Sequence, residues 1–178
     1  NSPQKISFTP VKVDLQDQDE LENSFARSLQ SQGFNEVMNN SLTSVKDETD
    51  AVKILNPLSK ELSTMRKSLL EGLLQNSSYN INRKNADIKF FELGKIYHKK
   101  DKYEERKQLA LLITGRNIAE NWLVPKSESS FFNMKAYVNM LLSRFQFELE
   151  EKPCKDERFS EGLELVVKGK TIARMGKV

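Results

Sequence analysis

The chain has 178 residues, 38% of them hydrophobic, and 28 basic against 25 acidic residues give a formal net charge of +3. This length suits a domain with a buried core, and the composition is that of a globular rather than a disordered protein. The charge is too mild to indicate a dedicated nucleic-acid binder, and no apolar run is long enough to span a bilayer.

The chain holds one cysteine, Cys154, and one histidine. These counts exclude an internal disulfide and the usual zinc patterns, and a single cysteine fits a reducing cytosol. No signal-peptide pattern precedes the first elements. Because Asn1 is not an initiator methionine and Val178 ends inside a predicted strand, we expect one cytoplasmic domain, residues 1–178, cut from a larger protein.

A first helix is predicted over Asp19–Gln32. Asp17, followed three residues later by Glu20, has the form of a capping box. Gly33 stands where a residue in the left-handed conformation commonly ends a helix. A short alternating segment, Val11–Leu15, precedes the helix. Apolar residues recur at helical spacing and give the helix one apolar face: Leu21, Phe25, Ala26 and Leu29.

Residues 34–43 predict a strand, and residues 52–55 predict a shorter one that stops before Pro57. Ser63 is a suitable N-cap for a second helix of about five turns. Gly72 inside that helix costs about 1 kcal/mol relative to alanine, so we expect a close contact there. The stripe of this helix comprises Met65, Leu69, Leu70, Leu73, Leu74, Ser77 and Ile81.

Two strands, Ile88–Lys99 and Gln108–Thr114, are predicted to form a hairpin with the charged turn Lys100–Lys107. A polar loop follows, for which Trp122 is the expected anchor. Asn133–Phe147 has helical periodicity.

The C-terminal part predicts strands, with a hairpin that turns at Lys168, Gly169 and Lys170. Helices interleaved with hairpins predict an α+β domain with a mostly antiparallel sheet.

Residues 33–42 fit the pattern GF-x-EV-x-TP-x-L at Gly33, Phe34, Glu36, Val37 and Leu42, with Asn40 in the proline position. This pattern resembles the first signature of class II aminoacyl-tRNA synthetases. The resemblance implies that the element builds a subunit interface, which makes Leu21, Phe25 and Leu29 candidate interface residues. An ordinary core helix is the alternative. On the interface hypothesis, Leu29→Asp weakens association with a partner and leaves the domain folded.

Residues 92–100 fit the second class II pattern, EIG-x-x-FR-x-E, at Glu92, Gly94 and Tyr97. The resemblance implies an arginine that holds the α-phosphate of ATP and a glutamate that orients the substrate. His98 stands in the arginine position and Lys100 in the glutamate position. A neutral imidazole does not replace a bidentate guanidinium, and lysine reverses the charge of the acceptor. We therefore expect a degenerate ATP site with no catalytic residue.

Two further stretches narrow the resemblance. Residues 56–74, NPLSKELSTMRKSLLEGLL, and Phe131–Lys135, FFNMK, resemble segments of the bacterial phenylalanine–tRNA ligase beta-subunit family. The third class II signature, a glycine-rich stretch that ends in arginine, has no match in residues 162–178.

This resemblance implies a class II synthetase-like fold whose own domain is inactive and supports assembly and tRNA docking. It implies a cytoplasmic α2β2 heterotetramer in which the alpha subunit uses ATP and magnesium to charge tRNA(Phe) with phenylalanine. It implies no cofactor and no metal ligand in this chain, and no membrane association.

Several cations are candidate contacts to tRNA or to the alpha subunit, with a solvated surface as the alternative: Arg66, Arg83, Lys84, Lys99 and Lys102. Two further hypotheses stay open at this level. One is a stand-alone regulatory or accessory protein with a synthetase-like fold. The other is a small enzyme that uses His98 as a general base.

Overall fold

The computed structural model describes residues 18–44, 50–99, 101–117 and 127–178. The predictions for Val11–Leu15, Trp122 and Lys100 lie outside these ranges. Among the described residues, no helix has the length and apolar character needed to cross a membrane.

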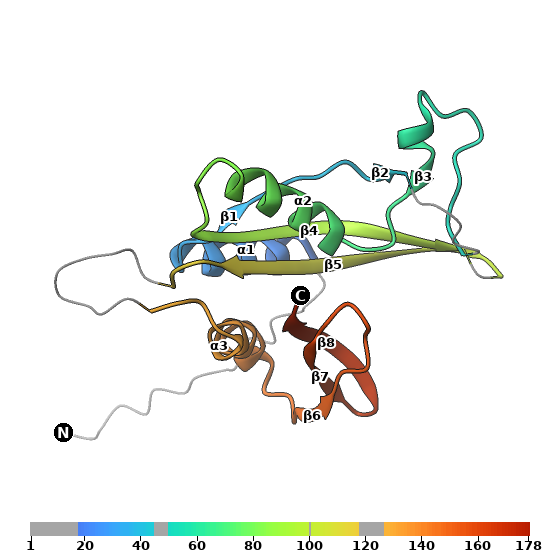
Figure 1. Ribbon diagram of the computed structural model, residues 1–178. Coiled ribbons are helices and arrows are strands. Elements are labelled where there is room, and N and C mark those ends of the chain that lie inside the picture. The colour runs from blue at the N-terminus through green and yellow to red at the C-terminus, as the bar shows by residue number, and fades with distance from the viewer. Residues whose placement is uncertain (1–17, 45–49, 100, 118–126) are drawn as a thin grey trace, which may run out of the picture.

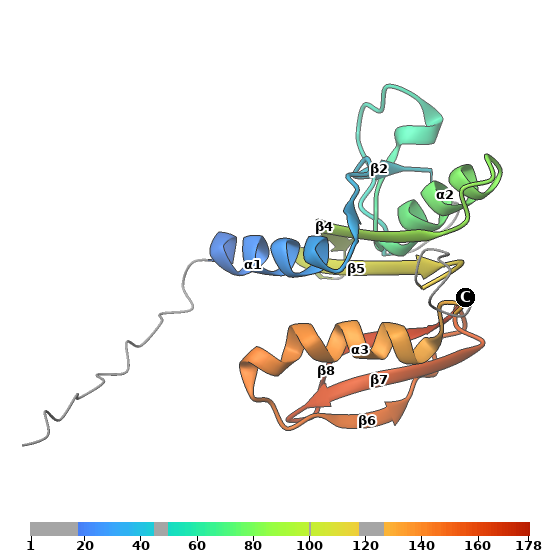
Figure 2. The same ribbon diagram turned by 90° about the vertical axis from the view of Figure 1, so that its left-hand side faces the viewer.

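A long hairpin, β4 (Ile88–Lys99) and β5 (Tyr103–Thr114), lies at the centre of the fold between helices on both faces (Figures 1 and 2). α2 (Leu70–Ile81) packs on one face. α1 (Gln18–Ser31) and α3 (Phe131–Leu142) pack on the other, where their apolar residues share one core with those of the hairpin. This is the expected α+β architecture, an antiparallel sheet flanked by helices.

The core on the α1 and α3 side contains four buried side chains: Leu29, Phe34, Phe91 and Leu141. Phe91 and Leu29 are 0% exposed, and the Phe34 ring meets the Tyr137 ring edge to face at 4.9 Å between centroids. Successive strand residues point to opposite faces, so alternate residues of β4 and β5 supply this core. It joins three segments that are distant in the sequence.

The register of the hairpin runs from Ile88 opposite Thr114 to Lys99 opposite Tyr103. The predicted turn Lys100–Lys107 is therefore too long, because the charged residues continue the strand. Opposite charges pair across it, as in Lys95 Nζ to Glu105 Oε1 at 2.6 Å. Such cross-strand pairs stabilise an exposed strand without apolar residues.

The predicted strand over residues 34–43 is interrupted. Its ends form β1 (Asn35–Glu36), parallel to β4, and β2 (Leu42–Thr43), antiparallel to β3 (Thr64–Met65). Between them the Asn39 N–H donates to the Glu92 carboxylate instead of to a neighbouring strand. The Glu92 carboxylate thus accepts the hydrogen bond that a neighbouring strand would accept if the strand were continuous.

The predicted start of the second helix at Ser63 is wrong. Ser63 lies at the end of the short 3-10 helix η1 (Lys60–Leu62), Thr64 and Met65 are in β3, and α2 begins at Leu70. Arg66 explains the difference. Its N–H donates to the Ser41 carbonyl and its carbonyl accepts from Tyr97 N–H, which holds this stretch extended between two strands.

α3 begins two residues earlier than predicted and is followed by the 3-10 helix η2 (Ser143–Phe145). Ser130 and Asn133 form a reciprocal capping box at its start, with Ser130 Oγ accepting from Asn133 N–H. This cap fixes the helix boundary at Phe131, ahead of the apolar periodicity from which the helix was predicted.

The C-terminal region forms a second antiparallel sheet of β6 (Glu150–Pro153), β7 (Glu161–Val167) and β8 (Lys170–Lys177). The predicted hairpin turn is confirmed. Lys168 and Gly169 have φ angles of 48° and 77°, as a two-residue type I′ turn requires. This sheet lies beside α3 (Figure 2).

Candidate functional site

The β4 segment that resembles the second class II signature presents two different faces. Glu92, Gly94, Ile96 and His98 alternate onto the face that α2 and the segment before it cover. A Cβ atom at Gly94 would overlap the Arg66 guanidinium and lie 3.2 Å from a Leu69 methyl group. The glycine is therefore required by the close approach of the Arg66 side chain.

Arg66 and Glu92 form a buried ion pair on this face. Arg66 Nη1 lies 2.5 Å from Glu92 Oε1, and the two residues are only 7% and 1% exposed. Arg66 Nε also donates to the Lys95 carbonyl at 3.0 Å. Buried charges need such compensation, because desolvation of each ion is costly. The predicted role of Arg66 as a contact to tRNA or a partner is therefore wrong.

Asn39 and Asn76 extend this network to α2. Asn39 Nδ2 donates to Glu92 Oε2 at 2.7 Å, and Asn76 Nδ2 donates to Asn39 Oδ1 at 2.9 Å. A Cβ atom at Gly72 would lie 2.8 Å from the Asn39 side chain. The close contact expected at Gly72 is thus confirmed. The network ties the segment after α1, the α2 helix and the hairpin together.

His98, in the signature's arginine position, lies near the far end of β4. Its Nδ1 is 3.8 Å from Asp50 Oδ2, and its side chain is 23% exposed. Asp50 also accepts from Lys67 Nζ at 2.5 Å, and this ammonium lowers the pKa of the Asp50 carboxyl. The Asp50 carboxylate therefore lies between the Lys67 ammonium and the His98 ring. Lys100 is outside the described residues.

One further guanidinium lies near His98. Arg106 is opposite Ile96 in the hairpin, which puts it on the same face as His98. Its Nη2 is 2.6 Å from Glu104 Oε2, and its side chain is 62% exposed. An exposed guanidinium tied to a neighbouring carboxylate is not positioned for bidentate phosphate binding.

The candidate interface residues of α1 separate into two groups. Leu29 is 0% exposed and belongs to the core of this chain, so the prediction that it contacts a partner is wrong. Helical geometry turns this residue under the sheet and against α3. Leu21 and Phe25 line a groove of about 370 Å³ between α1 and the hairpin, together with Leu93 and Leu109.

The rim of this groove is charged. Lys107 Nζ lies 2.6 Å from Glu22 Oε1, and this carboxylate raises the pKa of Lys107. Lys95, paired with Glu105, lines the same groove. An apolar floor with a charged rim is the pattern of a protein contact surface.

The remaining cationic candidates are exposed. Arg83 and Lys84 follow α2, and the Arg83 guanidinium lies 3.4 Å from the centroid of the Tyr79 ring. Lys99 and Lys102 flank the hairpin turn, and Lys99 Nζ lies 5.5 Å from the centroid of the Tyr103 ring. These four candidates therefore form two separate exposed groups, one at each end of the sheet.

Within the described residues, no group of three or more histidine, cysteine or acidic side chains is arranged to hold a metal ion. Cys154 Sγ lies 3.6 Å from Glu164 Oε1 in the C-terminal sheet.

The sequence reasoning missed Asp50 as the neighbour of His98 and Glu92 as the partner of Arg66. The sequence held a sign of the second pair, Arg66 with Glu92. Glu92 stands between Phe91 and Leu93 in a strand that was predicted, and a buried carboxylate requires a cationic partner.

The fold defines the class of this protein. The structure resembles a crystal structure of pyrrolysyl-tRNA synthetase from Desulfitobacterium hafniense with a TM-score of 0.65, over 87% of this chain and 57% of that one, at 17% sequence identity. A second structure of that enzyme gives a TM-score of 0.60 over 87% of this chain and 56% of the other. The fold is that of a class II aminoacyl-tRNA synthetase.

The sequence comparisons give the family. The family model for the phenylalanyl-tRNA synthetase beta chain CLM domain matches residues 3–178. The chain is 38% identical to the phenylalanine–tRNA ligase beta subunit of Bacteroides thetaiotaomicron over 89% of its length, and 36% identical to that of Bacteroides fragilis over 98%. The chain belongs to this beta-chain family. It spans 22% and 24% of the length of these two relatives.

Proposed function

We propose that this chain is the non-catalytic synthetase-like domain of a phenylalanine–tRNA ligase beta subunit. In this role it supports the α2β2 assembly and the docking of tRNA(Phe) in the cytoplasm. The alpha subunit then charges the tRNA with phenylalanine, and ATP and magnesium act there. The family match and the shared fold support the proposal.

The observation that carries it is the residue in the position of the phosphate-binding arginine. That residue is His98, whose ring lies beside Asp50. The buried Arg66 cannot supply the missing guanidinium, because its charge is already compensated by Glu92 and its side chain fills the space over Gly94. The hairpin thus has the backbone scaffold of an adenylate-forming site but lacks the arginine that would bind the phosphate.

The groove between α1 and the hairpin supports the assembly role. Its floor is apolar, and Leu21 and Phe25, two of the residues predicted for the interface, lie in it. We propose that the alpha subunit contacts this groove.

ATP–pyrophosphate exchange with phenylalanine tests the loss of catalysis. We expect no exchange by the purified chain, and normal exchange by the alpha–beta enzyme that carries His98→Ala. Exchange by the chain itself that His98→Ala or Arg106→Ala abolishes would overturn the proposal. Co-purification with a tagged alpha subunit separates the beta-subunit role from that of a stand-alone accessory protein.

A further inference from the structure

Two tyrosines in the described part of the chain are more than half exposed, and each has a cation near its ring. Tyr79 in α2 is 58% exposed, and Tyr103 in β5 is 72% exposed. The guanidinium carbon of Arg83 lies 3.4 Å from the centroid of the Tyr79 ring, and Lys99 Nζ lies 5.5 Å from the centroid of the Tyr103 ring. Exposed aromatic rings beside cations are the parts from which sites for single-stranded nucleic acid are built.

The contact between Tyr79 and Arg83 is a close stack. At 3.4 Å from the centroid the guanidinium lies directly over the ring, and Arg83 Nη1 also donates to the Tyr79 carbonyl at 3.1 Å. RNA bases stack on both kinds of plane, the aromatic ring and the guanidinium. Because Tyr79 keeps its exposure although Arg83 covers one face of the ring, a base can reach the stack.

The turn after α2 holds this stack in place. Arg83 N–H and Asn85 N–H both donate to the Asn80 carbonyl, at 2.9 and 3.0 Å. Lys84 N–H donates to the Ile81 carbonyl at 2.9 Å, and Lys84 has a left-handed φ of 66° where the chain leaves the helix. A surface that is already ordered loses little conformational entropy when a ligand binds.

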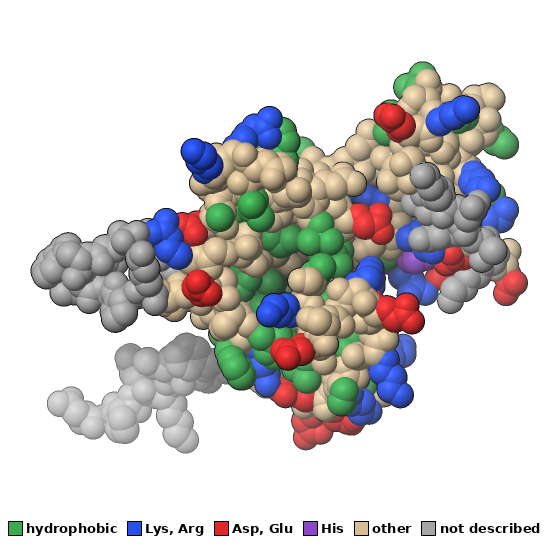
Figure 3. Space-filling model, in the orientation of Figure 1, with side chains coloured by type: hydrophobic (Ala, Val, Ile, Leu, Met, Phe, Trp, Pro, Cys, Tyr) green, Lys and Arg blue, Asp and Glu red, His purple; other side chains and the backbone are tan. Residues whose placement is uncertain are grey.

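The charge around the stack favours a polyanion. Residues 72–86 contain no acidic residue, and both Arg83 and Lys84 are exposed. The next acid along the chain is Asp87, whose carboxylate accepts from Arg116 Nε at 2.7 Å and lies 2.6 Å from Arg116 Nη2. Figure 3 shows basic side chains over this end of α2. A phosphate that approaches the stack therefore meets cations that carry no carboxylate of their own turn.

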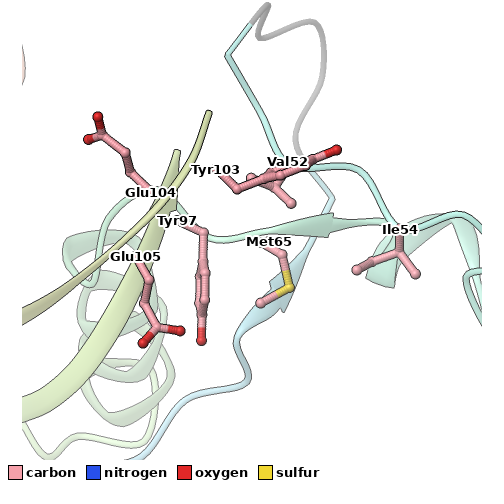
Figure 4. A pocket seen from close by; sticks show the side chains of 7 residues that line it. All are labelled: Val52, Ile54, Met65, Tyr97, Tyr103, Glu104 and Glu105. Carbon is pink, nitrogen blue, oxygen red and sulfur yellow. The ribbon is translucent and has the colours of Figure 1, made fainter. Parts of the chain in front are cut away.

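The surroundings of Tyr103 are different. Tyr103 lines an apolar cavity of about 350 Å³ together with Glu104 and Glu105 (Figure 4). The side chains of these two glutamates are 40% and 49% exposed, so they repel a phosphate backbone. Of the two exposed tyrosines, only Tyr79 combines an accessible ring with an excess of positive charge.

We propose that the Tyr79–Arg83 stack binds one unpaired base of RNA and that Lys84 contacts the adjacent phosphate. Every base has a π face, so the site accepts any base and reads no sequence. This inference rests on the proposed tRNA docking and gives it a particular residue and mode of contact. The contact is an unpaired nucleotide held by stacking, in addition to a backbone held by charge.

Fluorescence anisotropy with a labelled single-stranded oligouridine tests the site on the purified chain. Tyr79→Leu keeps the residue apolar but removes the ring, and we expect it to weaken binding by about fivefold or more. Tyr79→Phe keeps the ring and should bind within about twofold of wild type. Tyr103→Leu, the same substitution at the other exposed tyrosine, should leave the affinity unchanged. Circular dichroism confirms that each variant is folded.

The salt dependence of binding separates stacking from charge. Arg83→Lys keeps the charge but lacks the planar guanidinium, so we expect weaker binding with an unchanged salt slope. Lys84→Ala keeps the stack and removes one phosphate contact, so we expect the salt slope to fall by about 0.7.

Three results would contradict the proposal: no binding of the oligouridine at low salt, wild-type affinity of Tyr79→Leu, or displacement of the RNA by polyglutamate at equal charge. The last result would show that the surface binds an acidic protein instead. Capture of the alpha subunit by a chain that fails this test removes only the RNA site. RNA binding without capture of the alpha subunit overturns the beta-subunit role and leaves the RNA site in place.

Discussion

Arg66 and Glu92 come from segments 26 residues apart and are the most costly charges in the described structure to bury. Their side chains explain two local features: the glycine at position 94 and the break in the strand at Asn39. Because each ion is compensated only by the other and by a few amides, removal of one leaves the other unpaired.

We predict that Glu92→Ala lowers the free energy of unfolding by about 3–5 kcal/mol, because the Arg66 guanidinium then stays buried without a counterion. The urea midpoint, followed by circular dichroism, measures this change. Glu61→Ala, the same substitution at an exposed position, is the control and should stay within about 0.5 kcal/mol of wild type. Equal midpoints for the two variants would show that the pair contributes nothing to stability.

At the scale of the element, α1 serves two purposes along its length. Its C-terminal half is buried under the sheet through Leu29, whereas Leu21 near its start lines an open groove. The apolar spacing is uniform along the helix, so the spacing does not show where the sheet ends and the groove begins.

We predict opposite effects for aspartate at the two ends of this helix. Leu29→Asp places a charge in the core and should unfold the chain at room temperature, or at least cost several kcal/mol. Leu21→Asp places its charge in a groove that Lys95 and Lys107 also line, so it should leave the urea midpoint within about 1 kcal/mol of wild type.

Capture of the alpha subunit by a tagged chain completes this test. Leu21→Asp should reduce the amount captured, whereas Asn23→Asp, on the exposed face of α1, should not. Full capture by Leu21→Asp would exclude the groove as the alpha-subunit contact, and a stable Leu29→Asp variant would contradict its place in the core.

At the scale of the whole molecule, the four exposed cationic candidates lie in two groups at opposite ends of the sheet. Arg83 and Lys84 follow α2 at one end, and Lys99 and Lys102 flank the hairpin turn at the other. The second group lies beside Glu104 and Glu105, which partly offset its charge. For this reason we propose Arg83 and Lys84, rather than the hairpin turn, as the contact to tRNA.

We predict that Arg83→Ala with Lys84→Ala, in the alpha–beta enzyme, weakens tRNA binding and reduces the steepness of its salt dependence by about one to two counterions. Filter binding over a range of salt concentrations measures both quantities. Lys155→Ala, which removes one exposed charge near the C-terminal sheet, should change neither. An unchanged salt slope in the double variant would remove these residues from the tRNA contact.

The sequence by itself determined those elements in which neighbouring residues all favour the same conformation. β4 has the predicted bounds, α1 differs from its prediction by one residue at each end, and the turn at Lys168 and Gly169 is the one that its residues favour. In each case the apolar pattern, the cap or the turn residues specify the same local conformation. The sequence alone also showed the family resemblance, because the motifs that carry it are short continuous segments.

Only the tertiary structure decided where Met65 and Leu29 belong. Met65 has helical spacing with Leu69, yet it lies in a strand, because Arg66 is held between Ser41 and Tyr97. Leu29 and Leu21 belong to the same apolar stripe of α1. Only Leu29 is fully buried, because α3 and the sheet cover that end of the helix. The periodicity of the side chains indicates which face of a helix is apolar. The contacts that cover the face, and the long-range hydrogen bonds that outweigh helix formation, exist only once distant segments have met.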